Sequence, residues 1–65
     1  MRYRNKQNQT YVAGSIIGHD DYFVARFEAN GRGRRVSHYR TTLGYAQAEL
    51  DRRAKRNGWT EVQDA

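Results

Sequence analysis

Only one segment of the sequence has the apolar repeat of a helix, and this limits the fold more than any other feature. The apolar side chains recur at three- and four-residue spacing at Leu43, Ala46, Leu50 and Ala54. Thr41 or Thr42 can cap the start, and Asn57-Gly58 supplies a stop, so the pattern predicts a helix over residues 42–57. A sheet that packs against a single helix keeps one face uncovered.

Three segments before the predicted helix are rich in β-branched and aromatic residues, which favour strands. We predict strands over residues 10–17, 22–29 and 34–40, joined by turns at residues 18–21 and 30–33. The expected fold is α+β: a three-stranded antiparallel β-meander packed against one C-terminal helix (β-β-β-α), with a short extended tail in which Trp59 covers the core.

A chain of 65 residues has material for one small core, so we expect a single domain over residues 10–65. Residues 1–9 carry Arg2, Arg4 and Lys6 without acidic residues or apolar periodicity, which predicts a flexible basic arm. The sequence has no Cys, no apolar run near the roughly 20 residues of a membrane span, and no recognisable signal peptide. We therefore expect a cytoplasmic protein without a membrane partner.

The register of the first hairpin determines which face of the sheet meets the helix. With a four-residue turn, the pairs on one face are Val12 with Phe27, Gly14 with Ala25, and Ile16 with Phe23. Large pairs at both ends and a small pair between them suit a packed helix, so we expect this face in the core. The opposite face then stays open and carries Tyr11, Tyr22 and Arg26, joined by Arg35, Ser37 and Tyr39 if the second turn has an even length. An odd-length turn would exchange the two faces of the third strand.

Arginine dominates the charge of the chain. Twelve Lys and Arg against seven Asp and Glu give a net charge of +5, and ten of the twelve are Arg, whose planar fork of donors fits phosphate or a guanine edge. Arg32, Arg34 and Arg35, beside two glycines, make the second turn a candidate phosphate clamp. The turn also has a purely structural interpretation, because a tight hairpin needs Asn-Gly with or without a ligand.

The chain lacks the residue patterns of catalysis, metal binding and cofactor binding. His19 and His38 fall on a turn and a strand, without the spacing of zinc ligands, and Asp20-Asp21 lacks the other oxygen ligands of a calcium loop. No Gly-rich nucleotide-binding loop precedes the helix. The sequence also shows no recognisable catalytic base that would activate Ser37 as a nucleophile. We therefore expect no enzyme activity, no metal and no cofactor.

Three stretches of the chain support a resemblance to known DNA-binding domains: Tyr-Phe-Val-Ala-Arg-Phe at residues 22–27, the arginine-rich turn up to Arg35, and the helix start at residues 41–49. Over about residues 10–57 this pattern resembles the DNA-binding domains of plant ethylene-response factors and the N-terminal arm-binding domains of phage and transposon integrases. The resemblance implies that the sheet enters the DNA major groove, with contacts from Arg26, Arg35, Ser37 and Tyr39. Size and layout also resemble small accessory proteins of phages and mobile elements.

We interpret the chain as a small nucleic-acid-binding accessory protein that contacts duplex DNA through its open sheet face and arginine-rich turn. One alternative is a phage-type inhibitor that binds a host defence protein, for example a CRISPR or restriction nuclease, through the same face; a phage protein of this kind would act in the host cytoplasm. A third is a single-strand or RNA binder that stacks bases on Tyr11 and Tyr22. The candidate contact residues are Arg2, Arg4, Tyr11, Tyr22, Arg26, Arg32, Arg34, Arg35, Ser37 and Tyr39.

Overall fold

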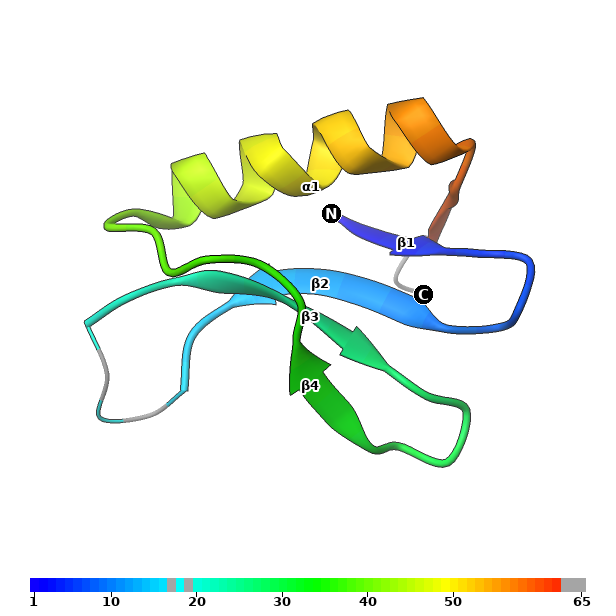
Figure 1. Cartoon of the computed structure of the whole chain (residues 1–65), viewed down its shortest axis with the longest axis horizontal. Coiled ribbons are helices and arrows are strands. Elements are labelled where there is room, and N and C mark those ends of the chain that lie inside the picture. Colours follow the sequence, from blue (N-terminus) through cyan, green and yellow to red (C-terminus); the bar gives the residue numbers. More distant parts are fainter. Residues whose placement is uncertain (17, 19, 63–65) are drawn as a thin grey trace.

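The computed structural model describes residues 1–16, 18 and 20–62, and it shows an antiparallel sheet packed against one helix (Figure 1). The elements, in chain order, are β1 (Arg2–Arg4), β2 (Thr10–Gly14), β3 (Phe23–Phe27), β4 (Gly33–Arg35), α1 (Leu43–Asn57) and β5 (Thr60–Val62). The five strands have the spatial order β4-β3-β2-β1-β5. The predicted α+β class is confirmed. The predicted three-stranded meander is corrected to five strands, and α1 is followed by β5 instead of ending the fold.

The segment predicted to be a flexible arm includes strand β1, which lies between β2 and β5. Tyr3 pairs with Tyr11 on one side and with Glu61 on the other. Its ring packs against the core, and its hydroxyl donates a hydrogen bond to Oδ1 of Asp51 in α1 at 2.7 Å. Because β5 is hydrogen-bonded to β1, the N-terminal strand joins the end of the chain to the rest of the sheet.

A compact turn between β1 and β2 explains why the chain folds back so early. The side-chain Oδ1 of Asn5 accepts hydrogen bonds from the backbone N–H groups of Gln7 and Gln9, both at 3.0 Å. Asn8 adopts φ of 64°, a left-handed conformation that Asn tolerates better than most residues. The asparagines of this segment are therefore turn-forming residues.

Strands β2 and β3 pair two residues out of the predicted register. Val12 lies opposite Ala25 and Gly14 opposite Phe23, because the connection between the strands runs over residues 15–22 and is longer than the predicted four-residue turn. Ile17 and His19, predicted in this region, lie outside the described residues. A two-residue shift keeps each side chain on its own side, so the grouping of Val12, Gly14, Phe23 and Ala25 on one face is confirmed.

Helix α1 packs on the other face, and the prediction of which face forms the core is wrong. The core contains Tyr11, Val24 and Leu50, and Trp59 stacks on Tyr11 with 3.9 Å between ring centroids and 12° between ring planes. Tyr3 packs against the same cluster. These two rings come from opposite ends of the chain and add apolar surface to the Tyr11 face, which the first hairpin alone does not reveal. The prediction that Trp59 covers the core is confirmed.

The ends of α1 agree with the prediction. The backbone N–H of Tyr45 donates to Oγ1 of Thr42 at 3.2 Å, and Gly58 ends the helix with φ of 71°, a conformation that favours glycine. The buried side chains of α1 include Ala46, Leu50 and Ala54. Leu43 was expected in the same stripe, but as the first residue of α1 it is 47% exposed.

A group of three charged side chains fixes α1 to the segment that precedes it. Glu49, on the buried side of α1, accepts hydrogen bonds from Arg40 at 2.6 and 3.1 Å, and Nη2 of Arg53 lies 3.2 Å from its other oxygen. Burial alone would raise the pKa of the Glu49 carboxyl. The hydrogen bond from Arg40 and the charge of Arg53 outweigh burial and hold this pKa below its usual range.

Candidate binding surface

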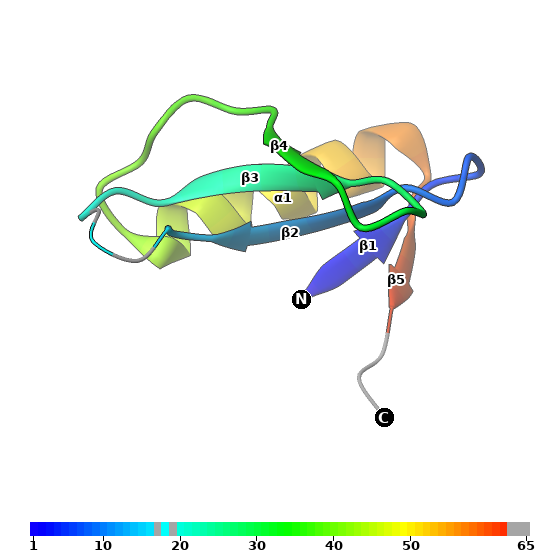
Figure 2. The same ribbon diagram turned by 90° about the horizontal axis from the view of Figure 1, so that it is seen from below.

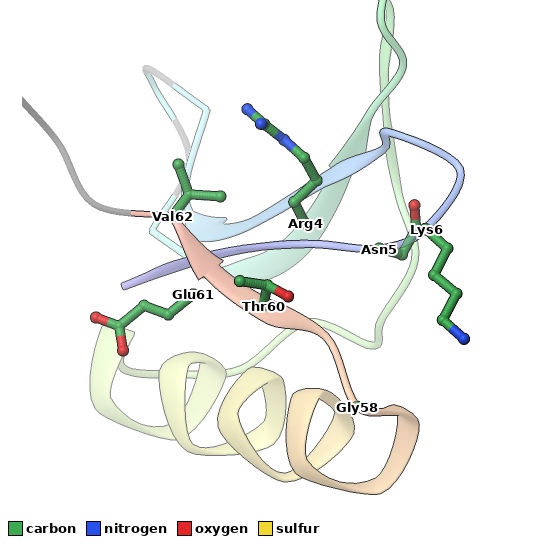
Figure 3. Close-up of a pocket in the computed structure, with 7 residues that line it drawn as sticks. All are labelled: Arg4, Asn5, Lys6, Gly58, Thr60, Glu61 and Val62. Carbon is green, nitrogen blue, oxygen red and sulfur yellow. The ribbon is translucent and has the colours of Figure 1, made fainter.

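The face of the sheet opposite α1, called here the open face, has no second layer over it within the described residues (Figure 2). Alternation and register place these strand residues on it: Arg2, Arg4, Thr10, Val12, Gly14, Phe23, Ala25, Phe27, Gly33, Arg35, Thr60 and Val62. None of these is acidic. The one carboxylate in the five strands as described, that of Glu61, points to the side of α1 (Figure 3).

A shallow hollow of about 370 Å³ occupies the part of the open face formed by β3 and β4. Phe23 and Ala25 are buried, whereas Ile16, Phe27 and Tyr39 in its lining are 55%, 39% and 50% exposed. Exposed aromatic and aliphatic groups gathered in one depression are typical of a binding surface. We call this depression the aromatic hollow.

Contacts with neighbouring residues hold Tyr39 in place beside the hollow. The edge of its ring meets Phe23, with 5.8 Å between centroids and 81° between planes. The Arg35 guanidinium carbon lies 4.5 Å from the Tyr39 ring centroid, which is a cation–π contact, and Nη1 of Arg35 donates to the Ser37 carbonyl at 2.5 Å. The guanidinium group and the ring are therefore fixed together before any ligand arrives.

Phe27 is positioned by the absence of a side chain at Gly33. The two residues are paired across β3 and β4, and a Cβ atom built on Gly33 would collide with Cε1 of the Phe27 ring and lie 2.7 Å from its Cδ1. The ring therefore lies directly over the Gly33 backbone. Glycine is needed here for close approach of the ring, since Gly33 is not among the glycines with positive φ.

Arg4 lies at the other end of the open face, close to β5. Figure 3 shows its side chain and that of Val62 pointing away from α1. A second hollow of about 400 Å³ lies here, lined by Arg4, Asn5, Lys6, Gly58, Thr60, Glu61 and Val62. It has no aromatic ring, so it is less suited than the aromatic hollow to an anionic aromatic ligand.

The structure separates the predicted contact residues into two groups. Tyr11 and Arg26 were predicted on the uncovered face but do not lie there, and Ser37, predicted there for an even second turn, is buried. Tyr11 is buried under Trp59, and Ser37 is buried with its Oγ accepting from the Val24 N–H at 2.8 Å. Arg26 lies on the side of α1, where its Nε is 3.2 Å from Oε1 of Glu28.

Of the other predicted residues, Arg35 and Tyr39 lie together at the aromatic hollow, and Arg4 lies on the same face. Arg2 shares that face by strand alternation. Arg34 lies in β4 opposite Arg26, on the side of α1, and Arg32 lies in the exposed turn. Tyr22 is half-buried and forms an isolated bridge with Arg40.

Sequence reasoning missed the residues that form the hollow itself. It placed Phe23 and Phe27 in the core, and it treated Gly33 only as a turn residue. The available signal was the segment Phe-Val-Ala-Arg-Phe of β3, in which Phe23, Ala25 and Phe27 alternate with Val24 and Arg26. Each face of that strand includes an apolar side chain, so either face was a candidate for the core.

Comparison of the chain with protein-family models, with curated proteins and with solved structures gave no match. Among the described residues, α1 is neither long nor apolar enough to cross a membrane. The same residues contain no cluster of three or more His, Asp or Glu side chains placed to hold a metal ion.

Proposed function

We propose that this protein binds nucleic acid through its open face. The observation that supports the proposal is the charge distribution of that face, where arginines accompany an aromatic hollow and the strand positions include no carboxylate. Phosphate groups of a nucleic acid would meet Arg35 at the hollow and Arg4 toward β5. Neutralising phosphates releases bound counterions, which drives association at low salt.

The arrangement of Arg35 favours binding because the side chain is already ordered. Its guanidinium lies on Tyr39 and donates one hydrogen bond to the Ser37 carbonyl, which leaves other N–H groups for a phosphate. A long side chain fixed before binding loses less conformational entropy when the ligand arrives. The net charge of +5 adds long-range attraction for a polyanion.

The first prediction concerns the arginines of the open face. The double variant Arg4→Gln/Arg35→Gln should bind labelled oligonucleotides about tenfold or more weakly at low salt. It should also reduce the slope of log affinity against log salt by about 0.7 to 0.9 for each lost phosphate contact. Fluorescence anisotropy across a salt series measures both quantities.

The matched control is Arg52→Gln/Arg56→Gln, which removes the same charge from exposed positions on α1. It should weaken binding much less. Equal losses in the two double variants would show general charge attraction without a binding face. Absence of binding to every oligonucleotide at low salt would overturn the proposal and leave the protein-inhibitor interpretation of the same face.

A further inference from the structure

We infer that the nucleic acid on the open face is single-stranded and that its unpaired bases stack in the aromatic hollow, on Phe27 and Tyr39. This inference rests on the proposed function and narrows it to one class of ligand. It also departs from the duplex expected from the sequence, and it uses rings other than Tyr11 and Tyr22.

The chemistry of the hollow suits the faces of bases better than their edges. Sequence reading in a duplex groove uses polar groups that donate to or accept from base edges. The polar side-chain groups at the hollow are the Arg35 guanidinium and the Tyr39 hydroxyl, while Ile16, Phe23, Ala25 and Phe27 are apolar. In a duplex the base faces are buried by stacking, whereas unpaired bases leave them available to aromatic side chains.

The dimensions of the sheet also favour a single strand. Five strands about 4.8 Å apart span roughly 19 Å, whereas the DNA major groove is about 12 Å wide and admits a two-stranded ribbon or a helix. Strand β1 pairs with β2 at Thr10 and Tyr11 and with β5 along all of its residues, so the open face is five strands wide at this end of the β2–β3 ladder. A flexible single strand can follow such a broad, twisted surface.

The arginines lie where a bound strand would pass. Arg35 in β4 adjoins the hollow, and Arg4 in β1 lies three strands away, roughly 14 Å across the sheet. A single strand that crosses from β4 to β1 would meet Arg35, place bases at Tyr39 and Phe27, and then reach Arg4. Alternating contacts of this kind, phosphates on cations and bases on rings, are the usual mode of single-strand binding.

The test compares single-stranded DNA, single-stranded RNA and duplex DNA of equal length and sequence at one low salt concentration. We expect the wild-type protein to prefer at least one single strand over the duplex. Phe27→Leu retains an apolar side chain but removes the ring, and Tyr39→Ala removes the second ring. Each should weaken single-strand binding by about 5- to 150-fold, the range found when a stacking aromatic residue is truncated.

Two further variants separate stacking from other effects of the substitutions. Tyr39→Phe should retain nearly all affinity, because the ring remains. Tyr45→Ala removes a tyrosine that is 65% exposed on α1, away from the open face, and should leave affinity unchanged. A base analogue such as 2-aminopurine in the oligonucleotide, whose fluorescence is quenched on stacking, should be quenched by the wild-type protein and less by Phe27→Leu.

Gly33→Ala tests whether the placement of the Phe27 ring matters. The new methyl group would displace the ring, so single-strand affinity should fall several-fold although both rings and all arginines remain. Circular dichroism and thermal unfolding should show that the variant is folded. Unchanged affinity in Gly33→Ala together with unchanged affinity in Phe27→Leu would exclude stacking on Phe27.

The possible results distinguish this inference from the proposal on which it rests. Equal or stronger binding of the duplex, with losses only in Arg4→Gln/Arg35→Gln, would overturn single-strand stacking and retain nucleic-acid binding. No binding of any oligonucleotide would overturn both. A preference for DNA or for RNA would support the inference in either case and would identify the sugar that the face accepts.

Discussion

Ser37 is a polar residue whose side chain belongs to the fold and not to the surface. Its Oγ accepts from the Val24 N–H and donates to the His38 carbonyl at 3.0 Å. Ser37→Ala would leave the buried Val24 N–H without this partner, so we expect the free energy of unfolding to fall by about 1–3 kcal/mol, as measured by urea denaturation.

Ser15→Ala is the control for this prediction, because Ser15 is exposed in the connection between β2 and β3. Its effect should stay within about 0.5 kcal/mol. Nucleic-acid affinity of the folded Ser37→Ala variant should match that of the wild type. Lost affinity with unchanged stability would instead make Ser37 a contact residue, as the sequence predicted.

At the level of single residues, the sequence shows which side chains can bind an anion but not which of them are already engaged. Arg35 and Tyr39 lie on the uncovered face, but beside Phe23 and Ala25 and not, as predicted for an even second turn, beside Tyr11 and Arg26. Arg26 has the same chemistry, but it faces Glu28 on the other side of the sheet. The difference depends on the side of the sheet that α1 covers, and no local pattern contains that information.

At the level of elements, the contact of Glu49 with Arg40 and Arg53 predicts how stability depends on pH. The pKa of Glu49 is lower in the folded protein than in the unfolded chain, so the ionised carboxylate stabilises the fold above the usual glutamate pKa of about 4.3. This contribution is lost as the pH falls through the folded pKa. The wild-type protein should therefore lose stability more steeply below about pH 4.3 than Glu49→Gln.

The measurement is the free energy of unfolding at several pH values between 7 and 3. At pH 7, Glu49→Gln should be less stable by about 1–3 kcal/mol, since two arginines lose a charged partner. Glu61→Gln, which removes a carboxylate from an exposed position in β5, is the matched variant measured in the same series. Parallel curves for the wild type and Glu49→Gln would contradict the role of this cluster.

The elements differ in how far the sequence determines them. Helix α1 was predicted within one residue at its start, because Thr42 and Gly58 act on the backbone next to them. The turn at Gly31, with φ of 89°, was recognised for the same reason. Strand β1 has three residues and no local apolar repeat, and besides its neighbour Tyr11 it is stabilised by Glu61 and Asp51, which are distant from Tyr3 in sequence.

At the scale of the whole molecule, β1 and β5 should open as one unit. All three residues of β5 are paired with β1, and Tyr3 connects β1 to α1 and the core. Tyr3→Ala should therefore reduce hydrogen-exchange protection in β1 and β5 together, while the amides between β2 and β3 keep most of theirs. Thr60→Val, which retains a β-branched residue at an exposed site, is the control. Loss of protection in β1 alone would contradict the coupling.

The candidate surface also depends on the whole molecule. The sequence correctly grouped Phe23, Ala25 and Val12 on one face, because side-chain alternation is a local property. It assigned that face to the core because large pairs at both ends and a small pair between them suit a packed helix. Tyr3 and Trp59 add two rings to the Tyr11 face, and this makes the Tyr11 face the core. The positions of both rings depend on the pairing of β1 and β5.

The pairing of β1 with β5 also determines when during synthesis the sheet can be completed. Arg2 lies opposite Val62, so this contact closes a loop that includes nearly all of the described chain, and such contacts form slowly. The hairpins β2–β3 and β3–β4 rely on nearer partners and can form earlier. Until β5 emerges from the ribosome, β1 exposes an unpaired edge, which is the stage at which the nascent chain is most open to pairing with another polypeptide.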